Sequence, residues 1–373
     1  MRRYDLDALR VMAFGLLIFY HVGMFFVPWG FHIKNNVVYD ELVLPMLFLN
    51  QWRLPLLFII SGMGTYFALS KRSGKQFAWE RIKRLFIPFL FGMLFIIPPQ
   101  IYVERLDKGQ FDGSYFQYWP AEAFQGGAYP DGNISWHHLW FILYLLIFSL
   151  LFIPAFLYLR KHTNAWMLRK LRTLGSNAAG LYVVAIPLLF WRILLEPYYP
   201  QTNGLINDWF NLVNYGSLFF IGFVLIAIKD AFWETVIRCR FKYLITGVIA
   251  FTSLMCLWYL VPGFEGKFYL SSLIRTINMW SWILVLFGYA AVYLNKPSKF
   301  LAYCNEAVYP FYILHQSVMM VLCYYLMDVS MGFFLKFSLL SLGTFGVSWL
   351  IYEICIRRYS FVRPLFGMKK KGC

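Results

Sequence analysis

Long apolar runs alternate with short polar segments along almost the whole chain. Each run is at least about 18 residues long, enough for one α-helix to cross the hydrocarbon core of a bilayer. The pattern predicts an all-α integral membrane protein, a polytopic bundle of about 10 transmembrane helices, with ends placed to within about 2–4 residues. The predicted spans are 10–31, 42–69, 82–103, 136–159, 178–195, 209–228, 243–262, 270–294, 300–327 and 332–356.

The first run has the outline of a signal peptide, because Arg2 and Arg3 precede it. It lacks a small-residue cleavage site and carries Arg10 and His21, so we interpret it as a retained helix.

The basic residues gather in every second segment between the apolar runs. With the N-terminus inside, the cytoplasmic segments and their flanks hold 26 of the 34 Lys and Arg residues, leaving 8 elsewhere. This positive-inside pattern predicts that both termini are cytoplasmic. The net charge of +16 is therefore explained by membrane topology, and no nucleic-acid partner is expected. The segments counted are 1–9, 70–81, 160–177, 229–242, 295–299 and 357–373, with Arg10, Lys83 and Arg84.

Composition agrees with a single membrane domain. Hydrophobic residues make up 60% of the chain and charged residues 14%, against about 25% charged in soluble domains. We expect a transmembrane domain over 1–357 and a basic cytoplasmic tail over 358–373. The six cysteines form no C-x-x-C motif and are expected to be apolar fillers or reduced thiols. No metal site and no tightly bound cofactor are predicted.

Ionisable residues inside spans are costly, so each needs a partner or a function. Arg10 and His21 are eleven positions apart, within about 20° of one helix face and roughly 16.5 Å apart along the axis. This places Arg10 near the cytoplasmic surface and His21 about halfway across the membrane. A snorkelling arginine with an internally bonded histidine is the alternative to a functional pair.

Two further arginines precede the third span. Arg81 and Arg84 are three positions apart, so on an α-helix they share a face at the cytoplasmic edge of the membrane. Two guanidinium groups there suit an anionic ligand, with phosphate favoured. The alternative is that these arginines only belong to the excess of positive charge that is usual in cytoplasmic segments.

His315 in the ninth span lies at a depth similar to His21. The two imidazoles could share a cavity, or His315 could only brace a helix contact. Glu306 is offered as the carboxylate partner of His21. Other polar candidates lie nearer the outside, and the Arg192/Glu196 pair is expected to be structural. Those outer candidates are Arg53, His137, His138 and Arg275.

Three local features complete the inventory. Pro55 and the small residues of 61–64 interrupt the second apolar run and permit a close helix approach. Trp140 belongs to an interfacial aromatic cluster over 136–141. The longest external loop, 104–135, is either a lid or acceptor-binding segment or a plain connector.

Several short motifs follow one another along the ten predicted spans. They are Tyr4-Asp5-Leu6-Asp7-Ala8-Leu9-Arg10 with His21 after ten intervening residues, Leu57-Phe58-Ile59-Ile60-Ser61-Gly62, Arg81-Ile82-Lys83-Arg84-Leu85-Phe86-Ile87-Pro88, the stretch from Trp136 to Tyr144, and Phe311-Tyr312-Ile313-Leu314-His315-Gln316. In this order they resemble the membrane-bound acyltransferase-3 family, particularly its glucan-modifying branch that includes periplasmic-glucan succinyltransferases. The resemblance covers residues 4 to about 325.

The resemblance implies an acyl-coenzyme A-dependent O-acyltransferase of the cell (inner or cytoplasmic) membrane. Such an enzyme moves an acyl group, of acetyl or succinyl class, from cytoplasmic acyl-coenzyme A to a hydroxyl of an extracytoplasmic carbohydrate. It implies that His21, with Arg10, is catalytic and that Arg81 and Arg84 bind the donor. His315, Ser61, Glu306 and Trp140 are accessory candidates.

The chain departs from members of the family that carry a fused hydrolase-like domain, so acceptor binding by the membrane domain and its loops, or with a periplasmic partner protein, is expected. The expected partners are acyl-coenzyme A, the carbohydrate acceptor and membrane lipids, with a homo-oligomer left open.

Two mechanisms and two rival functions remain open on the sequence. His21 could act as a general base toward the sugar hydroxyl, or carry the acyl group covalently. A proton-coupled transporter or lipid-linked sugar flippase would use His21 and His315 as a proton path. A non-enzymatic membrane scaffold would leave the buried Arg10 and His21 unexplained.

Overall fold

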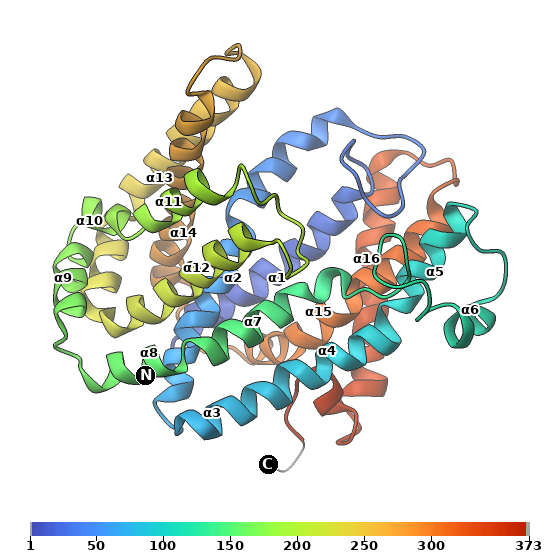
Figure 1. Ribbon diagram of the computed structural model, residues 1–373, viewed down its shortest axis with the longest axis horizontal. Coiled ribbons are helices and arrows are strands. Elements are labelled where there is room, and N and C mark those ends of the chain that lie inside the picture. The colour runs from blue at the N-terminus through green and yellow to red at the C-terminus, as the bar shows by residue number, and fades with distance from the viewer. Residues whose placement is uncertain (1, 371–373) are drawn as a thin grey trace. The chain divides into compact units, whose positions relative to one another are not determined.

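Helices account for nearly all the regular structure in the computed structural model, which describes residues 2–370. No strand forms within these residues. Figure 1 labels the α-helices, α1 Tyr4–Met24, α2 Val43–Leu69, α3 Gly74–Arg81, α4 Ile87–Phe91, α5 Pro98–Asp107, α6 Tyr115–Ala121, α7 Trp140–Leu151, α8 Ile153–Lys161, α9 Trp166–Gly175, α10 Ala178–Val183, α11 Ile186–Leu195, α12 Trp209–Ala227, α13 Lys229–Tyr259, α14 Lys267–Tyr293, α15 Lys299–Leu326 and α16 Phe333–Ile351.

Six shorter segments join or extend these helices. Three are 3₁₀-helical, η1 Asp40–Leu42, η4 His137–Leu139 and η6 Arg363–Phe366. Three are π-helical, η2 Ile82–Phe86, η3 Gly92–Ile96 and η5 Tyr352–Ile356.

The described helices confirm the predicted membrane-spanning architecture. By length and composition, 9 of the helical stretches among the described residues can cross a membrane, or 10 if the pair His137–Leu151 and Ile153–Lys161, bent by 50°, is one span. A helix pairs its backbone N–H and C=O groups internally, which a membrane-spanning segment needs because lipid chains offer no hydrogen-bond partners. The protein is therefore a polytopic membrane protein; that both termini are cytoplasmic stays a prediction.

The first helix differs from its predicted bounds in a way that matters for His21. The apolar run predicts 10–31, whereas α1 ends at Met24. The chain then turns, and Phe25 and Phe26 enter a buried apolar cluster outside the helix. His21 therefore lies in the last turn of α1, and not near the middle of a long span.

Contacts divide the chain into two compact units. Unit 1 comprises the described residues up to Ala13, Phe48–Trp79 and Ile147–Leu301. Unit 2 comprises Phe14–Leu47, Glu80–Leu146 and the described residues from Ala302 onward. Each is described separately below.

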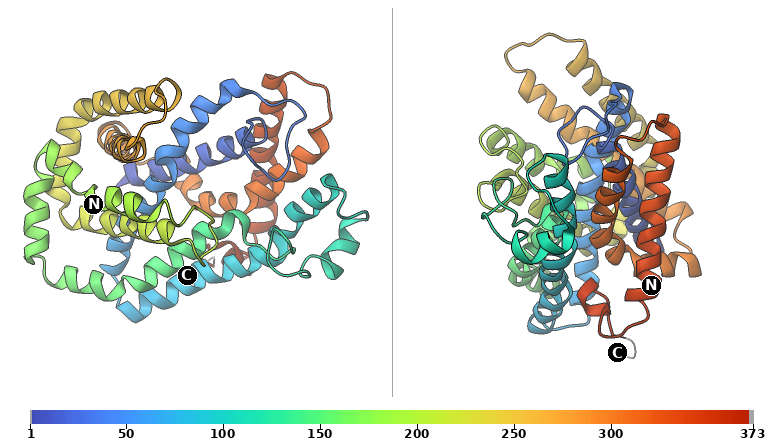
Figure 2. Two further views of the ribbon diagram at one scale, coloured as in Figure 1. Left: turned by 45° about the horizontal axis from the view of Figure 1, so that its top comes forward. Right: turned by 90° about the vertical axis from the view of Figure 1, so that its right-hand side faces the viewer.

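Unit 1 contains a close helix crossing and a long antiparallel pair. A side chain on Gly62 of α2 would strike the carbonyl oxygen of Phe219 on α12, and one on Gly222 would strike that of Ile59. The backbones therefore touch, as the small residues of the second span predicted. Pro55 does not interrupt α2, which is one helix. The long helices α13 and α14 pack side by side, as Figures 1 and 2 show.

The predicted Arg192/Glu196 pair is confirmed in unit 1. Arg192 Nη1 donates to both carboxylate oxygens of Glu196 at 2.9 Å. Arg275 Nη1 reaches the same carboxylate at 3.0 Å. The carboxylate of Glu196 thus binds two guanidinium groups, one from α11 and one from α14. This links the two helices, so the Arg192/Glu196 pair is structural.

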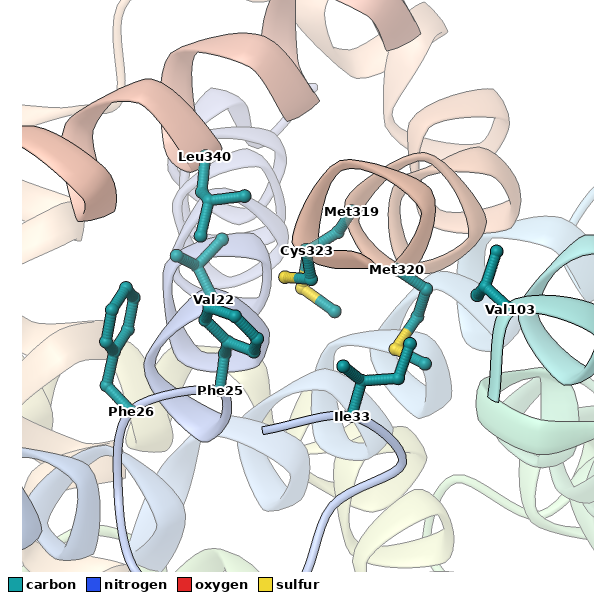
Figure 3. Close-up of a cluster of buried hydrophobic side chains, with 9 residues drawn as sticks. All are labelled: Val22, Phe25, Phe26, Ile33, Val103, Met319, Met320, Cys323 and Leu340. Atoms are coloured by element: carbon teal, nitrogen blue, oxygen red, sulfur yellow. The ribbon is translucent and has the colours of Figure 1, made fainter. Parts of the chain in front are cut away.

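Unit 2 is built around an apolar cluster that joins the end of α1 to α5, α15 and α16. Figure 3 shows its side chains meeting between these elements. This packing holds the last turn of α1, with His21, against α15, with His315. The cluster comprises Val22, Phe25, Phe26, Ile33, Val103, Met319, Met320, Cys323 and Leu340.

Candidate functional site

Five of the six histidines lie in unit 2, and ring contacts link them into two neighbouring groups. His21, His138 and His315 form the first group, and His32 and His137 form the second. The sixth, His162, is exposed and follows α8 in unit 1. Ionisable side chains are rare within membrane-spanning segments and mark functional sites, so the first group is the candidate active site.

His21 and His315 are directly hydrogen-bonded, as their similar predicted depths allowed. His21 Nδ1 lies 2.8 Å from His315 Nε2, and the rings stack with centroids 5.0 Å apart. His315 is fully buried, whereas His21 is half-buried. The pair therefore presents one imidazole to its surroundings and keeps the other inside the unit.

The backbone determines which nitrogen of each ring carries a proton. His315 Nδ1 lies 2.6 Å from the carbonyl oxygen of Tyr312, which can only accept, so this nitrogen carries the hydrogen. Neutral His315 then accepts at Nε2, and His21 must donate from Nδ1. The lone pair of neutral His21 is consequently on Nε2. This is the protonation state that a general base needs.

His138 is hydrogen-bonded to α15 next to the His21–His315 pair. Its Nε2 donates to the carbonyl oxygen of Ile313 at 3.1 Å, and its ring meets His315 edge-on with centroids 5.0 Å apart. The hydroxyl of Tyr312 donates to the carbonyl oxygen of His138. Gln100 of α5 donates to Ser317 of α15 at 2.7 Å. His138 and Gln100 thus position the α15 backbone that orients His315.

The two donor-site candidates lie at the junction of α3 and η2 in unit 2. Arg81 ends α3 and Arg84 lies in η2. A π-helix has more residues per turn than an α-helix, so the two side chains diverge more than the predicted shared face implies. Arg84 is exposed, and its Nε donates to the carbonyl oxygen of Gly367 at 3.1 Å.

The C-terminal segment packs against this basic junction. Segment η6 contacts η2 and α4. Gly367 has a φ of 69°, and a Cβ there would strike the Tyr309 ring and approach the backbone oxygen of Arg84. Glycine is therefore required for this approach. The predicted tail over 358–373 is in part structured, and residues 371–373 lie outside the described part of the chain.

The remaining candidates have more local roles in their own units. Arg10, in unit 1, is bonded to Asp7 at 3.1 Å. Ser61, also in unit 1, donates to Leu57 of its own helix at 2.7 Å. Trp140, in unit 2, is buried at the start of α7, 5.1 Å from the Tyr144 ring.

Glu306 is paired differently from the prediction. Arg363 Nη2 donates to it at 2.7 Å. Glu306 lies nine residues before His315 on α15, about 13.5 Å along the axis. It is therefore too far along the helix to bond the imidazole that His315 bonds. The hydrogen-bond partner observed for His21 is His315.

Two site residues escaped the sequence analysis. Gln100 lies where an apolar run gives way to polar residues, and it belongs to no motif. His32 lies in the segment after α1, and the apolar run, which continues past the end of that helix, gave no sign of this segment. Neither residue has a sequence signal of its own. The similar spacing of His21 and His315 from their helix starts signalled only that pair.

Comparison with known proteins adds the chemical context. The sequence profile of acyltransferase family 3, described as an acyltransferase domain, matches residues 3–353. Glucans biosynthesis protein C of Salmonella paratyphi B (strain ATCC BAA-1250 / SPB7) is 23% identical over 374 residues, covering 95% of this chain and 92% of that protein. The protein of the same name from Salmonella heidelberg (strain SL476) is 22% identical with the same coverage.

Proposed function

The chain belongs to the acyltransferase-3 family and is a polytopic membrane acyltransferase, and from that premise we propose its reaction. It moves an acyl group, of acetyl or succinyl class, from cytoplasmic acyl-coenzyme A to a hydroxyl of an extracytoplasmic carbohydrate. A glucan is the favoured acceptor, because relatives over nearly the full length are named for glucan biosynthesis. The membrane is the cytoplasmic one, where acyl-coenzyme A is available.

The observation that carries this proposal is the His21–His315 hydrogen bond. Nε2 of His21 accepts the proton of the sugar hydroxyl as that oxygen attacks the thioester carbonyl carbon. The new C–O bond forms, the C–S bond breaks, and the coenzyme A thiolate leaves. The proton on His21 then neutralises the thiolate, so that no net proton is gained or lost.

His315 completes a base-and-orienter arrangement. As His21 gains a proton, its Nδ1–H donates to His315 Nε2 at 2.8 Å, which stabilises the imidazolium. The Tyr312 carbonyl holds His315 in the accepting tautomer. A nucleophile, a base and a group that orients the base recur on many unrelated folds. Here a neutral imidazole and a backbone carbonyl take the place of a carboxylate.

The donor is held through its phosphates at Arg81 and Arg84. Coenzyme A is polyanionic, and guanidinium groups are suited to phosphate oxygens. Its slender pantetheine arm can extend between helices of unit 2 toward His21. Arg10, on the same helix as His21, stays a catalytic candidate from the sequence.

We predict that replacing Arg81 or Arg84 with alanine lowers the affinity for acyl-coenzyme A at least about tenfold. Loss of one charge-assisted contact costs about 1.5–3 kcal/mol. Isothermal titration calorimetry of the purified protein measures the change, and affinity for the glycan acceptor should change less. Because Arg84 also bonds Gly367, Arg84→Lys separates charge from the geometry of the guanidinium group.

The matched control is Lys75→Ala, which removes an exposed basic residue of α3. It should leave donor affinity within about twofold, because one exposed charge contributes little. Equal losses of donor affinity in all three variants would mean that the arginines only contribute to the positive charge that sets membrane topology. Failure of wild-type protein to bind acyl-coenzyme A would favour the transporter or flippase, which have no need of that ligand.

We also predict that donor and acceptor react from opposite faces of the membrane. Arg81 and Arg84 lie in a segment that the charge distribution assigns to the cytoplasm, and the loop over 104–135 is assigned outside. Protein is reconstituted in one orientation in sealed vesicles, with acyl-coenzyme A on one face and glycan on the other. Product is expected with the substrates on opposite faces, and detergent should abolish the requirement. Product formed only with both substrates on one face would contradict the trans-bilayer arrangement.

A further inference from the structure

A second group of polar side chains lies in unit 2, apart from the His21–His315 pair. It consists of His32, Glu104 and His137, whose nearest nitrogen and oxygen atoms all lie within 4.8 Å of one another. The imidazoles of His32 and His137 stack nearly parallel, with centroids 4.4 Å apart. Two imidazoles and one carboxylate are a common ligand set for zinc. The acyl-transfer scheme uses none of the three.

Glu104 is fixed on α5 with its two oxygens in different surroundings. It is fully buried. Oε2 faces His32 Nδ1 at 2.9 Å, whereas Oε1 binds the Tyr129 hydroxyl at 2.9 Å and the Lys108 ammonium at 2.5 Å. Outer partners of this kind orient a carboxylate that binds a metal through its other oxygen. Oε2 is thus the oxygen available to a cation.

His137 is held in a position that hydrogen bonding alone does not explain. Its φ is 39°, in the left-handed region that residues other than glycine seldom adopt. Its Nδ1 lies 2.6 Å from the Ser135 hydroxyl, yet its buried Nε2 has no hydrogen-bond partner among the described residues. When Nδ1–H donates to Ser135, Nε2 carries a lone pair. Strained backbone and an unpaired buried nitrogen together indicate a ligand.

The loop that carries these residues is tied to the same helix. Arg105, next to Glu104 on α5, donates to the carbonyl oxygens of Pro130 and Gly132 at 2.7 and 2.9 Å. It also bonds the Asn133 side chain at 3.0 Å. The external segment is therefore anchored on α5, with Tyr129 and His137 on either side of the anchor. A rigid support of this kind is what a metal site requires.

We propose that His32, Glu104 and His137 bind a divalent transition metal, with zinc the best match. His32 Nδ1, Glu104 Oε2 and His137 Nε2 are the three protein ligands, and the Tyr129 hydroxyl lies 3.2 Å from His32 Nδ1. Zinc displaces the proton that His32 and Glu104 share, because metal ligands must be deprotonated. The site is independent of the proposed acyl transfer and revises the expectation, from the sequence, of no metal.

The test uses full-length protein purified without a polyhistidine tag and stripped of metal with a chelator. Titration with zinc chloride, followed by metal analysis after gel filtration, should give one zinc per chain. Cobalt(II) should give the visible absorption of a nitrogen–oxygen site, without the thiolate charge-transfer band that binding to a cysteine produces. Glu104→Gln and His137→Ala should each weaken zinc binding at least about tenfold.

His162→Ala is the matched control, because it removes the one histidine outside both groups and should leave zinc binding unchanged. Lys108→Met removes one of the outer partners that orient Glu104 and should weaken zinc binding about tenfold. This variant keeps the test decisive if a ligand variant fails to fold.

Two outcomes would overturn the proposal. One is wild-type protein that retains no zinc after gel filtration. The other is zinc binding that Glu104→Gln and His137→Ala leave unchanged, or a cobalt spectrum with the thiolate band, since either places the metal elsewhere.

Discussion

Replacing His21 with alanine is expected to lower the rate of acyl transfer by about 10²- to 10⁴-fold, the usual contribution of a general base. The variant loses the Nε2 lone pair that, in the proposed reaction, receives the hydroxyl proton. Its affinity for acyl-coenzyme A should change little, because the proposed donor contacts are at Arg81 and Arg84. Single-turnover transfer from labelled acyl-coenzyme A to a glycan, in detergent, measures the effect.

The control is His162→Ala, which removes an exposed histidine of unit 1 and should retain full activity. Both variants should insert and purify like the wild type, because His21 lies at a half-buried position of α1 and the apolar cluster of unit 2 does not include it. Activity of His21→Ala within about tenfold of wild type would eliminate the catalytic role.

Replacing His315 with leucine is expected to lower the same rate by at least about 10²-fold, because His21 loses the acceptor that selects its tautomer and stabilises its imidazolium. His315→Gln should recover part of the loss, since an amide oxygen can accept from His21 Nδ1. Single-turnover rates of both variants, measured beside donor affinity, separate this positioning role from substrate binding.

The double variant His21→Ala/His315→Leu tests whether the two imidazoles act together. If the two imidazoles act as one unit, the double variant should be no slower than His21→Ala. Losses that multiply would mean that His315 acts apart from His21. Equal activities of the Leu and Gln variants would show that His315 only fills space on α15.

The spans, the basic segments and the family motifs could be read from the order of residues alone, because each depends on a local property. A run of about 18 apolar residues meets the thickness of a bilayer whatever its neighbours are. The stretch 178–195 was predicted with the observed bounds, as α10 and α11 together. Arg10 and His21 were identified by their fixed spacing on one helix.

The end of α1 was missed for a physical reason. Hydropathy does not distinguish an apolar helix from an apolar turn that is buried by its neighbours. Phe25 and Phe26 continue the apolar run, but they pack against α15 and α16 instead of extending the helix. Tertiary packing therefore decided that His21 lies in a last turn and not at mid-span.

The partners of the site residues were likewise decided by the fold. His315 lies 294 positions from His21, and His32 lies 72 positions from Glu104. No local periodicity relates side chains so far apart, because helix packing selects which faces meet. Sequence alone therefore established the class of protein, its spans and a short set of polar candidates. The pairing of His21 with His315, of Glu306 with Arg363, and the His32–Glu104–His137 group came only from the tertiary structure, since hydrogen bonds form between atoms that are close in space and not in sequence.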